Sequence, residues 1–258
     1  MKFALVDNQK TKATKGAKGF CPSCGSELIA KCGEVKLHHW AHKGVRNCDP
    51  WWENETQWHR SWKSHFSKEW QEVVHKADNG EKHIADVKTE HGWVLEFQHS
   101  YLNPEERRSR DAFYPKLVWV VDGLRRKRDK KQFQNILEDS TVIHSQPVIR
   151  KVNWPKECRI LTEWLTSPNL VFFDFQESNL WFLLPIPSSS EAFIMTIFRK
   201  DFIEYQINER FEKLIVEQIN PICEQLVRLK NQQRKKRNII TLRKGISNRE
   251  LRRRNRRF

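Results

Sequence analysis

The sequence predicts an α/β fold in which a mixed sheet is flanked by helices, with an N-terminal zinc-binding segment and a helical, basic C-terminal region. Three observations predict it. Between residues 51 and 123 the pattern runs helix, strand, strand, helix, strand, an order typical of layered α/β domains. Four of the six cysteines lie between Cys21 and Cys48, close to clustered histidines. The stretch from Asn231 to Phe258 has twelve Lys/Arg and one Glu, which is most of the net charge of +15.

The chain is expected to divide into four parts. At 258 residues it is long enough to bury a sizeable core. The parts are an N-terminal strand with a zinc-finger-like segment (1–50), a nuclease-like core (51–125), a mixed α/β region ending in a long helix (126–230) and a basic tail (231–258).

The N-terminal segment opens with a short strand, MKFALV, and then presents two local pairs of metal ligands. Cys21 and Cys24 form a C-x-x-C pair, and His39 and His42 form an H-x-x-H pair. Two thiolates and two imidazoles suit tetrahedral Zn²⁺ in a structural role. Nearby alternatives as ligands are Cys32, His38 and Cys48. The opposing interpretation is a set of reduced cysteines and surface histidines.

The stretch from residue 51 to about 75 has a helical pattern. Trp58, Trp62, Phe66 and Trp70 recur every four residues, and Val73 continues the stripe. Polar side chains lie within or beside this core-facing stripe, where they are unusual, so the helix is expected to line a site. They are Glu55, His59 and Lys63.

Two strands are expected at residues 83–89 and 92–100, joined by a turn at His91-Gly92. Each strand holds a carboxylate among apolar residues, Asp86 on the first and Glu96 on the second. Neighbouring antiparallel strands can bring residues ten apart side by side, and two such carboxylates repel each other unless a cation lies between them. Mg²⁺ is held by one or two carboxylates with water and substrate phosphate, and Mn²⁺ can take its place. The opposing interpretation is a surface turn in which both acids face solvent.

The later elements follow in order. Pro104 and two glutamates begin a helix, and residues 116–123 form a strand buried on both faces. A basic helical stretch, 124–139, precedes short aromatic-rich strands over 141–200. A long amphipathic helix is expected from about residue 202 to 237 despite Pro221.

Composition excludes some classes of protein. The sequence has no run of 18 apolar residues and no apolar N-terminal leader, so neither a transmembrane helix nor a secretory signal is expected. The uneven distribution of the cysteines along the chain fits a protein of the reducing cytoplasm. The charge of the tail suits nucleic-acid phosphates, and DNA is the expected partner, although an acidic protein partner or an anionic membrane surface would also attract it. Its densest arginines are Arg252, Arg253, Arg254, Arg256 and Arg257.

Residues 1 to about 125 together resemble the competence protein CoiA-like family of bacterial nucleases. The motifs are CPSC, KCGEVKLHHWAHK, ENETQWHRSWK, HIADV, LEFQHS, Arg110 with Tyr114, and LVWVVDG, in the family's order. That family is placed in the PD-(D/E)XK superfamily, which has a mixed sheet flanked by helices and cuts DNA with a divalent metal. The resemblance implies that Asp86 and Glu96 are the metal-binding pair and that Glu55 is the helix-borne acid.

One position departs from the superfamily pattern. The residue after Glu-x is usually Lys, and here it is Gln98, as in many CoiA-like sequences. A lysine would place a positive charge beside the reacting phosphate, whereas glutamine can only orient a water or donate a neutral hydrogen bond. Lys63 or Lys88 could supply the charge instead.

Two other functions stay open at this point. An HNH-like nuclease would use His38 or His39 to activate water and would leave Asp86 and Glu96 idle. A nuclease fold that has lost activity would bind nucleic acid without cutting it, and Gln98 is the residue that favours this alternative.

Overall fold

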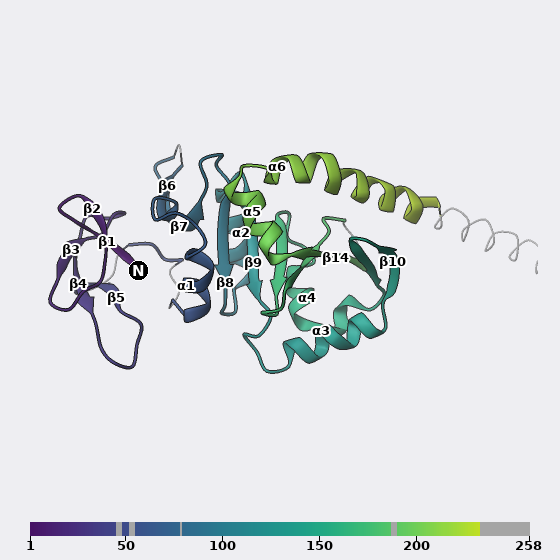
Figure 1. The fold of residues 1–258 in the computed structure, drawn as a ribbon, viewed down its shortest axis with the longest axis horizontal. Helices are drawn as coiled ribbons and strands as arrows, with labels where there is room; N and C mark the ends of the chain where they lie inside the picture. The colour runs from purple at the N-terminus through teal and green to yellow at the C-terminus, as the bar shows by residue number, and fades with distance from the viewer. Residues whose placement is uncertain (45–47, 52–54, 78, 187–189, 233–258) are drawn as a thin grey trace, which may run out of the picture. The chain divides into compact units, whose positions relative to one another are not determined.

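The computed structural model describes residues 1–44, 48–51, 55–77, 79–186 and 190–232. The chain forms two compact units, Met1–Arg210 and Phe211–Phe258. Figure 1 shows its helices and strands in chain order. In the described part of the chain, no helix is both long enough and apolar enough to cross a membrane.

The first unit begins with a small antiparallel sheet of five strands in the order β2-β1-β3-β4-β5. Its strands are β1 (Phe3–Val6), β2 (Gln9–Lys12), β3 (Lys18–Phe20), β4 (Glu27–Lys31) and β5 (His39–His42). The predicted opening strand is therefore present. A small apolar cluster fills this sheet's core and consists of Met1, Ala4, Ala13, Cys21, Leu28 and Trp40. So few residues give little burial, which is why a metal would matter to this segment.

The second sheet has nine strands in the order β10-β11-β14-β13-β12-β9-β8-β7-β6. Its centre is parallel, since β9 pairs in parallel with both β8 and β12. The strands are β6 (Gln71–Lys76), β7 (Lys82–Lys88), β8 (Val94–Gln98), β9 (Leu117–Asp122), β10 (Thr141–Ser145), β11 (Val148–Val152), β12 (Leu170–Asp174), β13 (Asn179–Leu183) and β14 (Ala192–Phe198).

Helices cover both faces of this larger sheet. On one face the rings of Trp62 in α1 (Gln57–Lys63) and Phe202 in α5 (Arg199–Ile207) lie 6.0 Å apart, and Trp62 stacks on Phe97 of β8. On the other face Trp119 of β9 packs against Trp164 of α4 (Arg159–Trp164). Also present are α2 (Pro104–Phe113), α3 (Asp129–Glu138) and the 3-10 turn η1 (Pro155–Glu157). The predicted α/β class is confirmed.

The helix predicted from residue 51 to about 75 is shorter. It runs only from Gln57 to Lys63, and Gln71–Lys76 is the edge strand β6. The aromatic stripe holds as far as Phe66, which is buried. Beyond it the β-branched Val73 and Val74 pair with β7, and this pairing overrides the helical spacing of the tryptophans.

Two further expectations are corrected in the C-terminal half. The stretch 141–200 holds the helix α4 among its strands. The long helix expected from residue 202 is interrupted: α5 ends at Ile207, and α6 (Phe211–Leu214) begins after a turn in which Glu209 has φ 59°. A π-helical segment, η2 (Ile215–Ile219), follows α6, and the chain stays helical from residue 220 to residue 232 across Pro221, whose ring nitrogen cannot donate, so the second part of the expected helix is present.

The larger sheet crosses the boundary expected at residue 125. Strand β12 pairs with β9 along its whole length, from Leu170↔Val118 to Asp174↔Asp122. Residues on both sides of that boundary therefore share one sheet.

Candidate functional site

Asp86 and Glu96 lie where β7 and β8 stop pairing. The last paired residues are Val87 and Leu95, and the two acids come next on their strands. The Asp86 backbone N–H donates to Glu96 Oε1 at 3.4 Å, and the Phe97 N–H donates to Asp86 Oδ2 at 3.0 Å. Carboxylate oxygens thus replace backbone carbonyls as acceptors, and the structure brings the predicted pair together.

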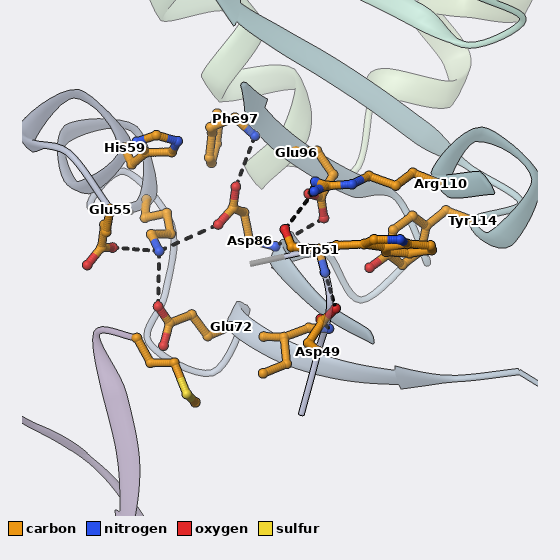
Figure 2. Close-up of a pocket in the computed structure, with 13 residues that line it drawn as sticks. Asp49, Trp51, Glu55, His59, Glu72, Asp86, Glu96, Phe97, Arg110 and Tyr114 are labelled. Carbon is orange, nitrogen blue, oxygen red and sulfur yellow. Dashed lines mark hydrogen bonds and ion pairs between the residues drawn. The ribbon is translucent and has the colours of Figure 1, made fainter. Parts of the chain in front are cut away.

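Helix α1 places Lys63 among carboxylates beside this pair. Its Nζ lies 2.6 Å from Glu55 Oε1, 3.0 Å from Glu72 Oε1 and 3.5 Å from Asp86 Oδ1. Figure 2 shows the carboxylates of Glu55, Glu72 and Asp86 turned toward one another, with Glu96 beside Arg110. A buried ammonium therefore holds three acids in place: Glu72 on β6, Asp86 on β7, and Glu55, which directly precedes the N-cap of α1 and is not part of the helix.

The charges in this network are fixed by their neighbours. Burial alone would lower the pKa of Lys63, but Glu72, Asp86 and Glu55 raise it above its ordinary value. Burial would raise the pKa of Glu72, yet Lys63 and the backbone N–H groups of Lys2 and Phe3 bring it to about 2. Lys63 is therefore an ammonium, and Glu72 is a carboxylate, throughout the neutral range.

Glu96 has a pKa that is shifted in the opposite direction from that of Glu72. Its carboxyl is buried, and burial together with the charge of Asp86 raises its pKa to about 8, although Arg110 of α2 works against the rise. Arg110 Nη1 lies 3.3 Å from Glu96 Oε2, and its Nη2 donates to the carbonyl of Trp51 at 2.6 Å. Without a further cation, Glu96 holds a proton at neutral pH.

These side chains enclose a cavity of about 80 Å³. It is lined by Met1, Asp49, Trp51, Glu55, His59, Lys63, Glu72, Ile84, Asp86, Glu96, Phe97, Arg110 and Tyr114. The Asp86 side chain is 25% exposed, so an ion can reach it, while Lys63 is only 3% exposed. A hard divalent cation such as Mg²⁺ would displace the proton of Glu96, so that two neighbouring carboxylates would hold the ion and their mutual repulsion would be relieved.

The predicted site residues divide into two sets. Glu55, His59 and Lys63 line the cavity with the acid pair. Gln98 and Lys88 are not among its lining residues in the described part of the chain. Gln98 Nε2 donates to the carbonyl of Ser100 at 3.1 Å, and Lys88 Nζ lies 2.8 Å from the His75 ring.

Sequence reasoning missed Glu72 and Asp49. Glu72 was read as part of a helix, but it lies on β6 with φ 48° and accepts from the backbone of Lys2 and Phe3 at 2.8 and 2.9 Å. Asp49 accepts from the N–H of Ile84 at 2.7 Å. The available signal for Glu72 was its position between Gln71 and two valines, a strand pattern with an acid in it.

A second cluster lies in the small sheet. The ligand atoms of Cys21, Cys24, His42 and Cys48 all lie within 4.8 Å of one another. Cys21 Sγ is 3.6 Å from Cys48 Sγ, and Cys24 Sγ is 3.3 Å from His42 Nε2. Three sulfurs and one imidazole nitrogen at such separations could hold a tetrahedral zinc ion.

The cluster includes Cys48, which the sequence offers as an alternative ligand, and does not include the expected ligand His39. Residues 39 and 42 lie on the strand β5, and an odd separation along a strand puts two side chains on opposite faces. His42 therefore joins the cluster, whereas His39 Nδ1 contacts the carbonyl of Leu37 at 2.8 Å.

The thiols of this cluster differ in acidity. Burial raises the pKa of Cys21 to about 12. Burial also acts to raise the pKa of Cys24, but hydrogen bonds with Ser26 and His42 bring it down to about 6. Cys24 is thus already a thiolate at neutral pH, and the charge of a bound metal would be needed to deprotonate Cys21.

The arginines predicted to bind nucleic acid, Arg252, Arg253, Arg254, Arg256 and Arg257, lie outside the described residues.

Comparison with known proteins finds CoiA. Residues 4–50 match the model of the N-terminal domain of competence protein CoiA. Competence protein CoiA of Bacillus subtilis (strain 168) is 39% identical over 57 residues, which are 22% of this chain and 15% of that relative. No solved structure gives a significant match. The predicted resemblance to CoiA is therefore confirmed, and the family model places it in residues 4–50.

Proposed function

We propose that this chain is a divalent-metal-dependent nuclease of the CoiA-like type, which hydrolyses phosphodiester bonds in DNA. One observation carries the proposal: Asp86 and Glu96, from adjoining strands, share a cavity with the buried Lys63 and Arg110. A pair of acids at the point where two antiparallel strands part, on a mixed sheet flanked by helices, supports a PD-(D/E)XK-type core.

Asp86 and Glu96 would hold Mg²⁺ or Mn²⁺. When bound, the ion would polarise the scissile phosphate and lower the pKa of an attacking water. The chain's own residues prepare that position. Lys63 orients Asp86 and Glu55, and Arg110 fixes Glu96 against α2. In this proposal Lys63 supplies the positive charge that Gln98 cannot supply.

The Cys/His cluster is proposed to hold a structural zinc ion rather than a catalytic one. Its four protein side chains would close the coordination shell, which leaves no position for substrate. The basic tail, by its charge, is proposed to add non-specific affinity for DNA.

The name of the relative, a competence protein, supports a role in DNA uptake or recombination in the cytoplasm. Defence against foreign DNA is the other role that a nuclease of this kind would suit.

Purified protein should be tested with single-stranded and duplex DNA and with RNA, with and without Mg²⁺ or Mn²⁺. Wild type is expected to cut DNA only with the metal, and the Asp86→Asn and Glu96→Gln variants to lose about 100-fold or more, since even indirect metal partners cost 10- to 100-fold. Glu90→Gln, an exposed acid in the turn between the same strands, is the matched control and should stay active.

Two results would contradict the proposal. Full activity in the Asp86→Asn, Glu96→Gln double variant would move the chemistry elsewhere, and loss of activity in a folded His38→Ala or His39→Ala variant would favour the HNH-like alternative. Absence of metal-dependent cleavage by wild type of every substrate would favour a binding protein without nuclease activity.

A further inference from the structure

A second, larger hollow lies on the other side of α1 from the acidic cavity. It has a volume of about 780 Å³ and runs between this helix and the segment 33–38, which joins β4 to β5. We call it the basic groove. Its charged lining consists of Lys2, Lys12, Lys36 and Arg60 against the single acid Glu34.

One face of α1 is built for this groove. Gln57, Arg60, Ser61 and Ser64 line it, and their spacing of three, one and three residues places them on one side of a helix. All four carry hydrogen-bond donors. The residues that line the acidic cavity, such as His59 and Lys63, occupy another side of the same helix.

Arg60 connects the groove to the acidic cavity. Its Nε pairs with Glu55 Oε2 at 2.9 Å, and Glu55 lines the cavity. Its Nη2 donates to the carbonyl of His38, in the segment that forms the opposite wall. A nucleic-acid strand lying in the groove would therefore contact Arg60, which is paired with Glu55 of the acidic cavity.

The chemistry of the lining favours a phosphate backbone. Among the lining residues that the structure describes, none is Phe, Tyr or Trp, which leaves His38 and Arg60 as the side chains on which an unpaired base could stack. Cations with hydroxyl and amide donors are instead the groups that contact phosphate and sugar without reading sequence. Lys12 and Lys36 are exposed and can reach such a ligand.

We propose that the basic groove binds the sugar–phosphate backbone of the nucleic acid and leads it to the cavity of Asp86 and Glu96. The inference rests on the proposed nuclease function for its direction, but the groove's affinity for the backbone can be measured without cleavage.

The test compares two double variants with equal loss of charge. Lys12→Ala with Lys36→Ala removes two groove cations, and Lys15→Ala with Lys18→Ala removes two exposed lysines of the same small sheet that do not line the groove. Binding of labelled duplex and single-stranded DNA is followed against salt in buffer without Mg²⁺, Mn²⁺ or chelator. Zinc content is measured for each protein, so that a loss of the small sheet is detected.

For the groove variant, the slope of log K against log salt should become shallower by about 1.8 on duplex DNA, or by about 1.4 on a single strand, which corresponds to two phosphate contacts. The control variant should keep the wild-type slope. If cleavage occurs, the groove variant should raise KM and leave kcat nearly unchanged.

An unchanged slope in the groove variant, or an equal loss in both variants, would overturn the proposal. Wild-type binding with the expected slopes but without metal-dependent cleavage would refute the nuclease function and leave the groove assignment standing. Cleavage by wild type together with an unchanged slope in the groove variant would refute the groove alone.

Discussion

The Asp86 backbone N–H lies 3.4 Å from Glu96 Oε1, while Asp86 Oδ2 lies 3.0 Å from the N–H of Phe97. Each acid therefore accepts a hydrogen bond from the backbone of the neighbouring strand, in addition to its proposed metal-binding role. Substitution by the isosteric amide keeps an acceptor oxygen in each position and removes the charge. For this reason Asp86→Asn and Glu96→Gln separate loss of charge from loss of fold better than alanine does.

The first prediction concerns pH and Glu96. Because the folded chain holds this proton more tightly, with a pKa of about 8 against an ordinary value of 4.5, stability in the absence of metal should fall as pH rises between those values. A divalent ion that needs the ionised carboxylate should offset this fall. Mg²⁺ is therefore expected to raise the Tm more at pH 8.5 with wild type than with Glu96→Gln, measured by thermal unfolding.

Thermal unfolding also tests the assignment of this effect to Glu96 and can contradict it. Glu96→Gln should be less sensitive to pH over this range than wild type, because the titrating group is gone. A wild-type Tm that Mg²⁺ leaves unchanged at pH 8.5 would show that the acid pair does not bind the ion.

The second prediction concerns Lys63, which is 3% exposed and contacts three carboxylates. Replacing it with methionine keeps the stem but removes the cation that the three acids share, and in the described part of the chain only Glu55 of the three keeps another ion pair, with Arg60. Breaking a buried charge pair by removing one partner costs about 3–5 kcal/mol, so Lys63→Met is expected to lower the free energy of unfolding by about that amount. Denaturant unfolding measures it.

Lys88→Met is the control for that experiment. Lys88 lies on β7, is half-buried and contacts His75 rather than an acid. It should cost less than about 1 kcal/mol, as for partly exposed charged groups. Equal losses in the two variants would mean that the acids around Lys63 adapt by taking up protons.

How far the sequence predicts the site depends on local spacing. Alternating apolar residues with a turn at Gly92 set the register of β7 and β8, so the meeting of Asp86 and Glu96 could be predicted. Glu72 could not, because the aromatic spacing from Trp58 to Trp70 also fits a helix. Strand pairing with β7 settles that ambiguity, and this is a tertiary effect.

The zinc cluster shows the same limit. The pair Cys21 and Cys24 was evident because a C-x-x-C turn brings its sulfurs together locally. The other pair depended on the secondary structure of residues 39–42: on a helix both histidines would face one side, but on the strand β5 they face opposite sides. Closeness in the sequence makes Cys48 an alternative ligand, but only the tertiary structure brings its Sγ to 3.6 Å from that of Cys21.

The third prediction follows from that cluster. Cys48→Ser is expected to lower the zinc content of purified protein well below one ion per chain and to destabilise the small sheet, because zinc binding contributes to its folding free energy. His39→Ala should retain zinc, since His39 contacts the Leu37 carbonyl. Elemental analysis and thermal unfolding check both. Zinc lost with His39→Ala and kept with Cys48→Ser would restore the ligand set expected from the sequence.

The last prediction concerns Gln98, at the position where the wider nuclease superfamily has lysine. Its Nε2 donates to the carbonyl of Ser100 at 3.1 Å, and it is outside the lining of the acidic cavity in the described residues. The carbonyl of Ser100 keeps a second donor, Arg125 Nη1 at 2.8 Å, so Gln98→Ala is expected to cost only about 0.5–1.5 kcal/mol of stability through the loss of one hydrogen bond. Below the unfolding temperature it should reduce kcat by less than tenfold, far less than Asp86→Asn. Single-turnover cleavage at saturating Mg²⁺ measures this difference. A loss as large as that of Asp86→Asn, in protein that unfolds normally, would place Gln98 at the reacting phosphate and remove the reason for assigning the charge to Lys63.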